Sequence, residues 1–427
     1  MQKKRITNWL KLIATYFFGQ GATQVIQLTT GFIIINFLTK EEYATFTLVL
    51  ALQSMANVLV ELGITRTLVP LIGKRYNDQD VVGRYFAACR FFRNATLSLG
   101  SVGLLIAFYF SAQKYDWSVG YWVVLWLTVI VALQGFTVGS IYTSVFLLRQ
   151  DLKTLYKIGL ISGTSRLLAI CLAQLMVGLS AQLALIFGSI QALIGGYTKK
   201  LLAKGAYSHP AKGTSLAKEK KEVLSQALPR APSVAFFAFE GQFTIFLMGI
   251  IGTTAGLGEL GALGRLGMLF LIVNKTGTML FSPHFSKREV HQVLPHALVS
   301  IGGASLFGSL VVGFIYLFPE TLLILLGEGY QHLRFEIVLV VMGSALRFVD
   351  IVSFSICLSR KYIFPWFSVV DILPLIIAMV VGFSFFDLST VRNMLYFSLV
   401  MSVIKLLTKF FILTVGIGRE LRAANTV

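Results

Sequence analysis

The stretch KKLLAKGAYSHPAKGTSLAKEKKEVLSQALPRAP, residues 199–232, is the only long polar segment of this sequence. It carries eight cations against Glu219 and Glu222, and Pro229 and Pro232 at its end break any helix that enters the next apolar run. No series of aromatic side chains alternates with the lysines, as stacking on bases would require, so nucleic acid is not expected as a partner. We expect a cytoplasmic linker with a short helix at 216–228, between domains 1–198 and 233–427.

Composition places the flanking domains in lipid. The chain has 427 residues, 56% of them hydrophobic and 13% charged, and a mean hydropathy of +0.77. A soluble protein carries about twice that share of charged residues. Cys89, Cys171 and Cys357 lie far apart, which fits neither a disulfide framework nor a metal site, and no cofactor is expected. No phosphate-binding loop is present, so transport would draw on an ion gradient or on the substrate itself.

Twelve apolar runs are long enough to cross the roughly 30 Å hydrocarbon core of a bilayer. Six precede the linker and six follow it, at 13–38, 44–70, 94–112, 119–147, 158–178, 182–198, 233–252, 261–283, 296–317, 337–358, 363–385 and 393–417. We therefore predict an all-α polytopic membrane protein, with about 12 transmembrane helices in two six-helix lobes around a central cavity.

The distribution of Lys and Arg predicts the orientation. With both termini in the cytoplasm, 26 of the 37 cations fall in cytoplasmic segments and four on the other side: Lys40, Lys114, Arg334 and Arg392. This is the positive-inside bias of multi-pass membrane proteins. Seven cations remain within the spans: Arg66, Arg166, Arg265, Lys275, Arg347, Lys405 and Lys409.

Charged groups near the bilayer centre cost about 2.5–3.5 kcal/mol each on insertion scales and usually face a protein interior or a wet cavity. Four cations are expected to line a substrate-binding lumen: Arg66, Arg166, Lys275 and Arg347. Four carboxylates at similar depth are candidates for ion coupling, because desolvation favours their protonation: Glu240 first, then Asp350, Glu61 and Asp371. The alternative is a set of fixed ion pairs, such as Arg347 with Asp350 at i, i+3. Lys409 and Arg265 are expected to lie near the membrane surfaces, Lys409 by snorkelling.

Polar residues repeat at helical spacing in the first two spans. Gln20, Gln24, Gln27 and Gly31 follow one face of the first span, and Gln53, Asn57, Glu61 and Thr65 one face of the second. A polar stripe on a spanning helix must face protein or water. We expect Gln24 and Asn57 to line the substrate lumen. Hydrogen bonding between helices in a dry bundle is the alternative.

A short internal repeat supports two similar lobes. The second span ends in TLVPLIGKR (67–75) and the eighth in LFSPHFSKR (280–288), with identical spacing of the proline and the basic pair. The placement favours a parallel repeat with the substrate bound between the lobes.

Two stretches resemble the polysaccharide-transport flippases, which export O-antigen and capsule units and belong to the multidrug, oligosaccharidyl-lipid and polysaccharide exporter superfamily. They are FLTKEEYATFTLVLALQSMANVLVELGITRTLVPLIGKR (37–75) and LGALGRLGMLFLIVNKTGTMLFSPHFSKR (260–288). The number of spans and the central linker also agree over nearly the whole length. Tyr43 departs from the pattern, because it follows Glu42 where a turn with glycine is common.

The resemblance implies a flippase that moves undecaprenyl-pyrophosphate-linked oligosaccharide across the bacterial inner membrane, for lipopolysaccharide O-antigen, capsule or exopolysaccharide. A polysaccharide polymerase and chain-length proteins are the implied protein partners. Two alternatives stay open. A cation-coupled drug exporter of the same superfamily would favour an acidic lumen. A membrane-embedded polymerase or ligase would need a large outward catalytic loop, and we expect no catalytic residues.

Overall fold

The computed structural model describes residues 2–211, 213–270, 274, 285, 289–360, 362 and 366–425. Within these residues the regular structure is entirely helical, with sixteen α-helices and five short 3₁₀ helices. The chain divides into two compact units, residues 1–243 and 244–427, so the polar linker belongs to the first unit. The helix predicted at 216–228 is confirmed as α8.

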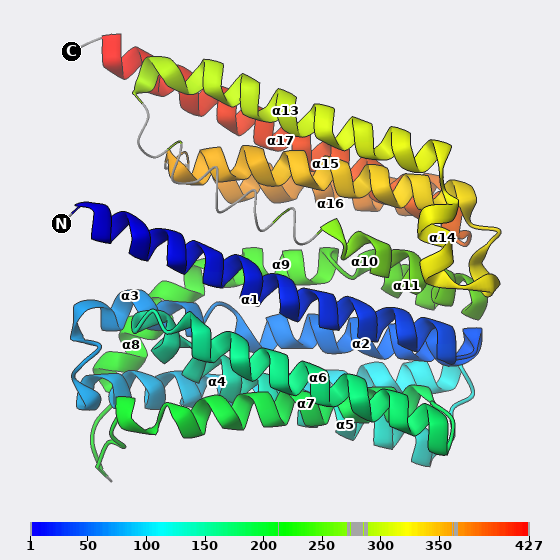
Figure 1. Cartoon of the computed structure of the whole chain (residues 1–427), viewed down its shortest axis with the longest axis horizontal. Coiled ribbons are helices and arrows are strands. Elements are labelled where there is room, and N and C mark those ends of the chain that lie inside the picture. Colours follow the sequence, from blue (N-terminus) through cyan, green and yellow to red (C-terminus); the bar gives the residue numbers. More distant parts are fainter. Residues whose placement is uncertain are drawn as a thin grey trace. The chain divides into compact units, whose positions relative to one another are not determined.

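The first unit holds the helices up to α9. They are α1 (Gln2–Phe37), α2 (Lys40–Glu61), α3 (Leu68–Ile72), α4 (Gln79–Lys114), α5 (Val119–Leu148), α6 (Leu152–Met176), α7 (Ala181–Leu202), α8 (Ala217–Ala227) and α9 (Ala231–Glu240) (Figure 1). The helices from α10 onward make the second unit. They are α10 (Phe243–Ile251), α11 (Thr254–Gly267), α13 (Val290–Leu317), α14 (Glu320–Leu326), α15 (Arg334–Ser359), α16 (Phe367–Phe385) and α17 (Val391–Asn425).

The helices begin where the sequence supplies a cap. The side chains of Thr39, Asp78, Ser118, Asp151 and Ser180 accept hydrogen bonds from the first backbone N–H groups of α2, α4, α5, α6 and α7. These N–H groups have no partner within the helix, and a capping oxygen stabilises each helix start by about 1 kcal/mol. The starts of α2, α5, α6 and α7, at residues 40, 119, 152 and 181, lie close to the predicted starts at 44, 119, 158 and 182, whereas α4 begins at Gln79, well before the predicted start at 94.

Eight described helices are long and apolar enough to cross a membrane, or nine if α9 and α10 form one broken span. The predicted spans at 13–38 and 363–385 correspond to α1 and α16, and the described part of the span predicted at 261–283 begins in α11. The described residues therefore form an all-helical architecture, with a helix at eleven of the twelve predicted spans and α11 at the start of the other. The second copy of the short repeat lies outside the described residues, except for Phe285.

Close helix packing in the first unit depends on small residues. Helix α5 packs along α7, and a side chain on Gly196 would collide with the backbone carbonyl of Gly135. In the second unit α13, α15 and α17 pack side by side, and Gly308 of α13 faces Ala345 of α15 (Figure 1). Small residues allow backbones to approach where no hydrophobic effect drives association, as in lipid.

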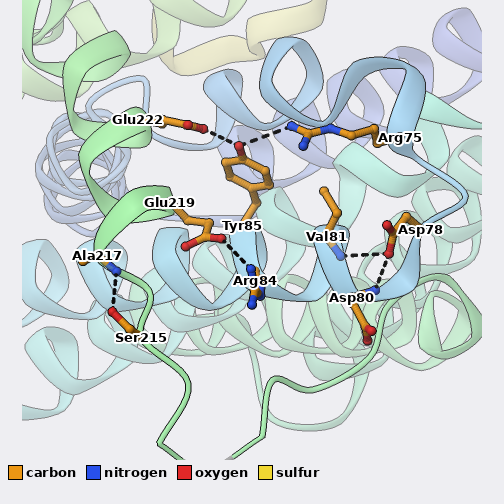
Figure 2. A network of polar contacts seen from close by, with 10 residues as sticks. All are labelled: Arg75, Asp78, Asp80, Val81, Arg84, Tyr85, Ser215, Ala217, Glu219 and Glu222. Carbon is orange, nitrogen blue, oxygen red and sulfur yellow. Dashed lines mark hydrogen bonds and ion pairs between the residues drawn. The ribbon is translucent and has the colours of Figure 1, made fainter.

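The linker helix α8 is docked on the start of α4. Tyr85 of α4 donates a hydrogen bond to Glu222, and Arg84 pairs with Glu219 at 3.3 Å (Figure 2). Arg75 reaches the Tyr85 hydroxyl from the other side at 3.5 Å. Val223 on the inner face of α8 is fully buried in the apolar core of this end of the unit. These contacts explain why the linker is part of the first unit.

Candidate functional site

The second predicted span breaks in its middle. Helix α2 ends at Glu61, and Leu62 and Gly63 both take positive φ angles, 42° and 76°. The Glu61 carboxylate accepts hydrogen bonds from the backbone N–H groups of Gly63 (2.9 Å) and Thr65 (3.2 Å). Thr96 of α4 donates to the carbonyl of Val60 at 2.8 Å. Backbone groups that a helix break frees inside a membrane need other hydrogen-bond partners. Glu61 provides them for the N–H groups of Gly63 and Thr65. This structural role of Glu61 was not predicted from the sequence.

Arg93 is the buried cation of this region. Its side chain is 0% exposed, and its Nη2 donates to the hydroxyl of Thr137 on α5 at 3.0 Å. Its Nε and Nη1 have no hydrogen-bond partner within the described structure, and Glu61 is the carboxylate whose charge acts on it. Arg93 is one of the 26 cations assigned to cytoplasmic segments from the sequence, and the structure shows that it lies within α4, fourteen residues after the helix begins at Gln79.

The second unit contains a buried ion pair. Lys409 of α17 donates a hydrogen bond to Asp371 of α16, and their side chains are only 8% and 7% exposed. The expectation that Lys409 snorkels to the surface is therefore wrong. Its stem is long enough to do so, but a carboxylate on the neighbouring helix satisfies the ammonium group inside the bundle.

Asp350 of α15 lies in the same charged cluster. Four charged groups act on it electrostatically: Lys409, Lys405 and Asp371, and more weakly Arg347. Its Oδ1 is buried and has no hydrogen-bond partner in the described residues. Since a carboxyl oxygen without a partner is costly to bury, this atom is suited to take up a proton or to meet a bound ion.

The fixed pair between Arg347 and Asp350 is not formed. Arg347 is exposed and Asp350 is half-buried, and no ion pair joins the two in the part of the chain that the structure describes. Spacing of i, i+3 places two residues on one side of a helix, but Lys409 and Lys405 of α17 act on Asp350 more strongly than Arg347 does. The charged cluster of the second unit is thus Arg347, Asp350, Asp371, Lys405 and Lys409.

The other predicted site residues are spread over the first unit and beyond. Gln24 is buried at 4% exposure, Asn57 is half-buried, and Arg66 is exposed just after the break in the second span. Arg166 is half-buried on α6 and reaches Gln191 of α7 at 3.4 Å. Glu240 is half-buried at the end of α9. Lys275 lies outside the described residues.

The structure thus brings together Asp350, Asp371 and Arg347 in the second unit. In the first unit Glu61 and Arg66 lie on either side of the break in the second span. The sequence analysis missed Arg93, and its signal would have been a cation one residue before an apolar run. Among the described residues no group of three or more His, Cys, Asp or Glu side chains could hold a metal ion.

Comparisons with known proteins identify the fold. No protein-family profile matches the sequence, and no curated protein matches it. Among solved structures, a multidrug-resistance MATE family transporter of the MOP superfamily, in its inward-facing conformation, aligns with a TM-score of 0.65 at 12% identity, over 95% of this chain and 96% of its own.

Two further solved structures agree. A MOP superfamily transporter from Pyrococcus furiosus, described by a reverse polarity of its binding pocket that suggests a different function, aligns with a TM-score of 0.60 at 14% identity, covering 96% of this chain and 95% of its own. The Vibrio cholerae MATE transporter VcmN in its bent form gives 0.55 at 14% identity, with 96% of each chain covered. This chain therefore has the fold of MOP superfamily transporters, a fold that these neighbours use for transport.

Proposed function

We propose that this chain is a flippase that moves undecaprenyl-pyrophosphate-linked oligosaccharide from the cytoplasmic to the outer leaflet of the bacterial inner membrane by alternating access. The product would supply O-antigen, capsule or exopolysaccharide. The observation that carries the proposal is the excess of cations over carboxylates within the predicted spans. The seven cations are Arg66, Arg166, Arg265, Lys275, Arg347, Lys405 and Lys409, and the four carboxylates are Glu61, Glu240, Asp350 and Asp371.

The charge excess suits the anionic part of this substrate. A pyrophosphate that enters a low-dielectric cavity loses its hydration, and an arginine can replace the lost water with paired, charge-assisted hydrogen bonds. The P. furiosus neighbour is described by a pocket of reverse polarity, so the polarity of the pocket varies among proteins of this fold. In this proposal Arg66, Arg166, Lys275, Arg347, Gln24 and Asn57 contact the substrate, and Arg93 adds to the field around them.

Flipping in proteoliposomes tests the proposal. Purified protein is reconstituted with a pyrophosphate-linked glycolipid, and transfer between leaflets is followed with an impermeant glycan-modifying enzyme. Arg166→Gln and Arg347→Gln at matched reconstitution should slow transfer by about tenfold or more, because each removes a charge-assisted contact worth about 1.5–3 kcal/mol. Arg334→Gln, an exposed cation paired with Glu320 at the far end of α15, is the matched control and should keep the wild-type rate. Wild-type protein that does not speed transfer refutes the flippase.

A cation-coupled drug exporter is the second candidate function. It is favoured by the multidrug transporters among the structural neighbours and by the buried carboxylates Asp350 and Asp371. Such an exporter would take up cationic dyes in the same vesicles in response to an imposed sodium or proton gradient. Dye uptake without glycolipid transfer would favour this candidate.

The orientation is part of the proposal. The bias of 26 cations to four places the linker and both termini in the cytoplasm. Cysteines introduced at Lys114 and at Lys212, which lies outside the described residues, should respond differently to an impermeant thiol reagent. In intact cells position 114 should react and position 212 should not, and the reverse pattern would invert the topology.

A further inference from the structure

A cavity of about 130 Å³ opens in the first unit between α4, α5 and α7. None of the site residues predicted from the sequence lines it, although Thr137, the partner of Arg93, does. Its polar lining comes from all three helices: Arg90 and Asn94, then Gln134, Thr137 and Tyr142, then Lys200.

The polar lining is cationic and rich in donors. Arg90 and Lys200 face the cavity, no lining residue is acidic, and no ion pair involves either cation in the described structure. Arg90 donates through Nη2 to the hydroxyl of Tyr142 at 2.7 Å, which fixes the guanidinium group and leaves its other N–H donors available. Behind the cavity wall, the buried Arg93 donates to Thr137 and adds a third positive charge. This lining fits an anion that carries several acceptor oxygens, such as a phosphate group.

The cavity lies near one end of the three helices. Lys200 is two residues from the end of α7 and Tyr142 six from the end of α5, both at ends predicted to be cytoplasmic. This places the cations at the depth of lipid headgroups rather than at the bilayer centre.

An exposed apolar face leads to the cavity. Ile190, Ile194, Tyr197 and Leu201 of α7 are 44%, 48%, 42% and 57% exposed. They are spaced at i, i+4, i+7 and i+11 and therefore share one side of the helix, and Tyr197 lines the cavity. A free phosphate ion has no apolar part that could contact this face, whereas the acyl chains of a lipid can lie along it.

We propose that this cavity binds the phosphate group of an anionic phospholipid from the cytoplasmic leaflet. Basic pockets between transmembrane helices on the cytoplasmic side recognise such headgroups. Arg90 and Lys200 bind the phosphate, Tyr142 orients Arg90, and the exposed face of α7 contacts the acyl chains. The proposal is independent of which substrate the protein transports.

Lipid-dependent thermal stability tests this site. Purified, detergent-solubilised protein is titrated with phosphatidylglycerol, with phosphatidylcholine or with inorganic pyrophosphate, and the unfolding midpoint is followed. Phosphatidylglycerol should raise the midpoint of the wild-type protein at concentrations at which the other two have no effect. The double variant Arg90→Gln/Lys200→Gln should bind phosphatidylglycerol about tenfold more weakly or worse, as expected for the loss of two charge-assisted contacts.

Two further variants distinguish loss of this site from a general loss of surface charge and from misfolding. Lys204→Gln/Lys218→Gln removes the same charge from exposed positions and should keep the wild-type response. Val138→Phe keeps both cations but fills the cavity and should lose the response. If the double variant does not yield folded protein, Lys200→Gln alone, in the last turn of α7, replaces it. Equal loss in the control variant overturns the proposal, as does an equal effect of pyrophosphate.

Discussion

Among the described residues, the fully buried cation Arg93 of the first unit bonds only to a hydroxyl group, whereas the buried cation Lys409 of the second unit bonds to the carboxylate of Asp371. Both side chains are removed from water, so both lose hydration. In the second unit an opposite charge in direct contact offsets the loss. In the first unit Glu61 acts only from a distance, and its oxygens are already bonded to the backbone at the break in the second span.

The contrast between Arg93 and Lys409 distinguishes charges that maintain the structure from charges that are available for function. A buried ion pair becomes costly when one partner is removed, because the other remains buried and unpaired. A buried cation without a bonded counter-ion already carries that cost in the native protein, and its removal relieves it. We therefore expect the charges of the second-unit pair to be needed for folding, and Arg93 to be needed for transport.

Breaking the Lys409–Asp371 pair should give the largest effect. Asp371→Asn alone leaves a buried ammonium group opposite a neutral amide and should destabilise the second unit by about 3–5 kcal/mol. The double variant Asp371→Asn/Lys409→Met removes both charges and should recover most of that loss. Thermal unfolding of the purified proteins measures both. A double variant that is no more stable than Asp371→Asn would show that the pair is not the source of the effect.

Arg93→Gln should affect transport strongly and stability little, the opposite of what we expect for Asp371→Asn. The shorter amide keeps a donor near Thr137 and removes the uncompensated charge, so the unfolding free energy should change by less than about 1 kcal/mol or rise. Glycolipid flipping, in contrast, should fall about tenfold or more if this charge attracts the anionic substrate. Arg93→Lys, which keeps the charge, should retain part of the activity. A stability loss as large as that of Asp371→Asn would assign Arg93 to the structure instead.

The two units also differ in their candidate coupling carboxylates. Asp350 has a buried oxygen without a partner in the described cluster, while Glu240 of the first unit is half-buried at a helix end. We expect Asp350→Asn to abolish the dependence of transport on an imposed pH gradient and to slow transport about tenfold, because the amide cannot exchange a proton. Glu240→Gln is the parallel variant, since the sequence alone favours Glu240. If transport by both variants still depends on the imposed pH gradient, neither carboxylate couples transport to protons.

Most helix positions could be predicted from the sequence because a helix that crosses lipid needs an apolar run of about 20 residues, and five of the helices begin at a polar cap. The burial of Arg93 could not, because the first turns of α4 are polar and resemble a loop until the helix is seen to be 36 residues long. The break at Leu62 and Gly63 leaves little trace in hydropathy, since both residues are apolar.

The partners of charged residues were the least predictable feature. Asp371 and Lys409 are 38 residues apart, and only the packing of α16 against α17 brings them together. Arg347 and Asp350 are three residues apart on α15, yet they form no ion pair in the described structure. The cations Lys405 and Lys409 of the neighbouring helix α17 act on Asp350 more strongly than Arg347 does. The roles of Arg66, Arg166 and Glu240 remain predictions for the experiments above.

Another ion pair, between Arg84 and Glu219, lies at the surface of the first unit, and substitutions in it should have small effects on stability. The ion pair Arg84–Glu219 resembles the pair in the second unit in chemistry, but Arg84 is 48% exposed and Glu219 only 7%. Loss of Glu219 lets Arg84 return to water, so Glu219→Gln should change the unfolding free energy by no more than about 0.5 kcal/mol.

Loss of Arg84 leaves a buried carboxylate, whose Oε2 already lacks a partner in the described structure. Arg84→Gln should therefore cost about 1 kcal/mol, because an unsatisfied buried acceptor is penalised even when the contact it has lost was weak. The test is whether Arg84→Gln lowers the unfolding free energy more than Glu219→Gln does. Thermal unfolding of the two single variants measures this difference. Equal effects of Arg84→Gln and Glu219→Gln would mean that burial of one partner does not decide what an ion pair contributes in this protein, and the contrast drawn between Arg93 and Lys409 would lose its physical basis.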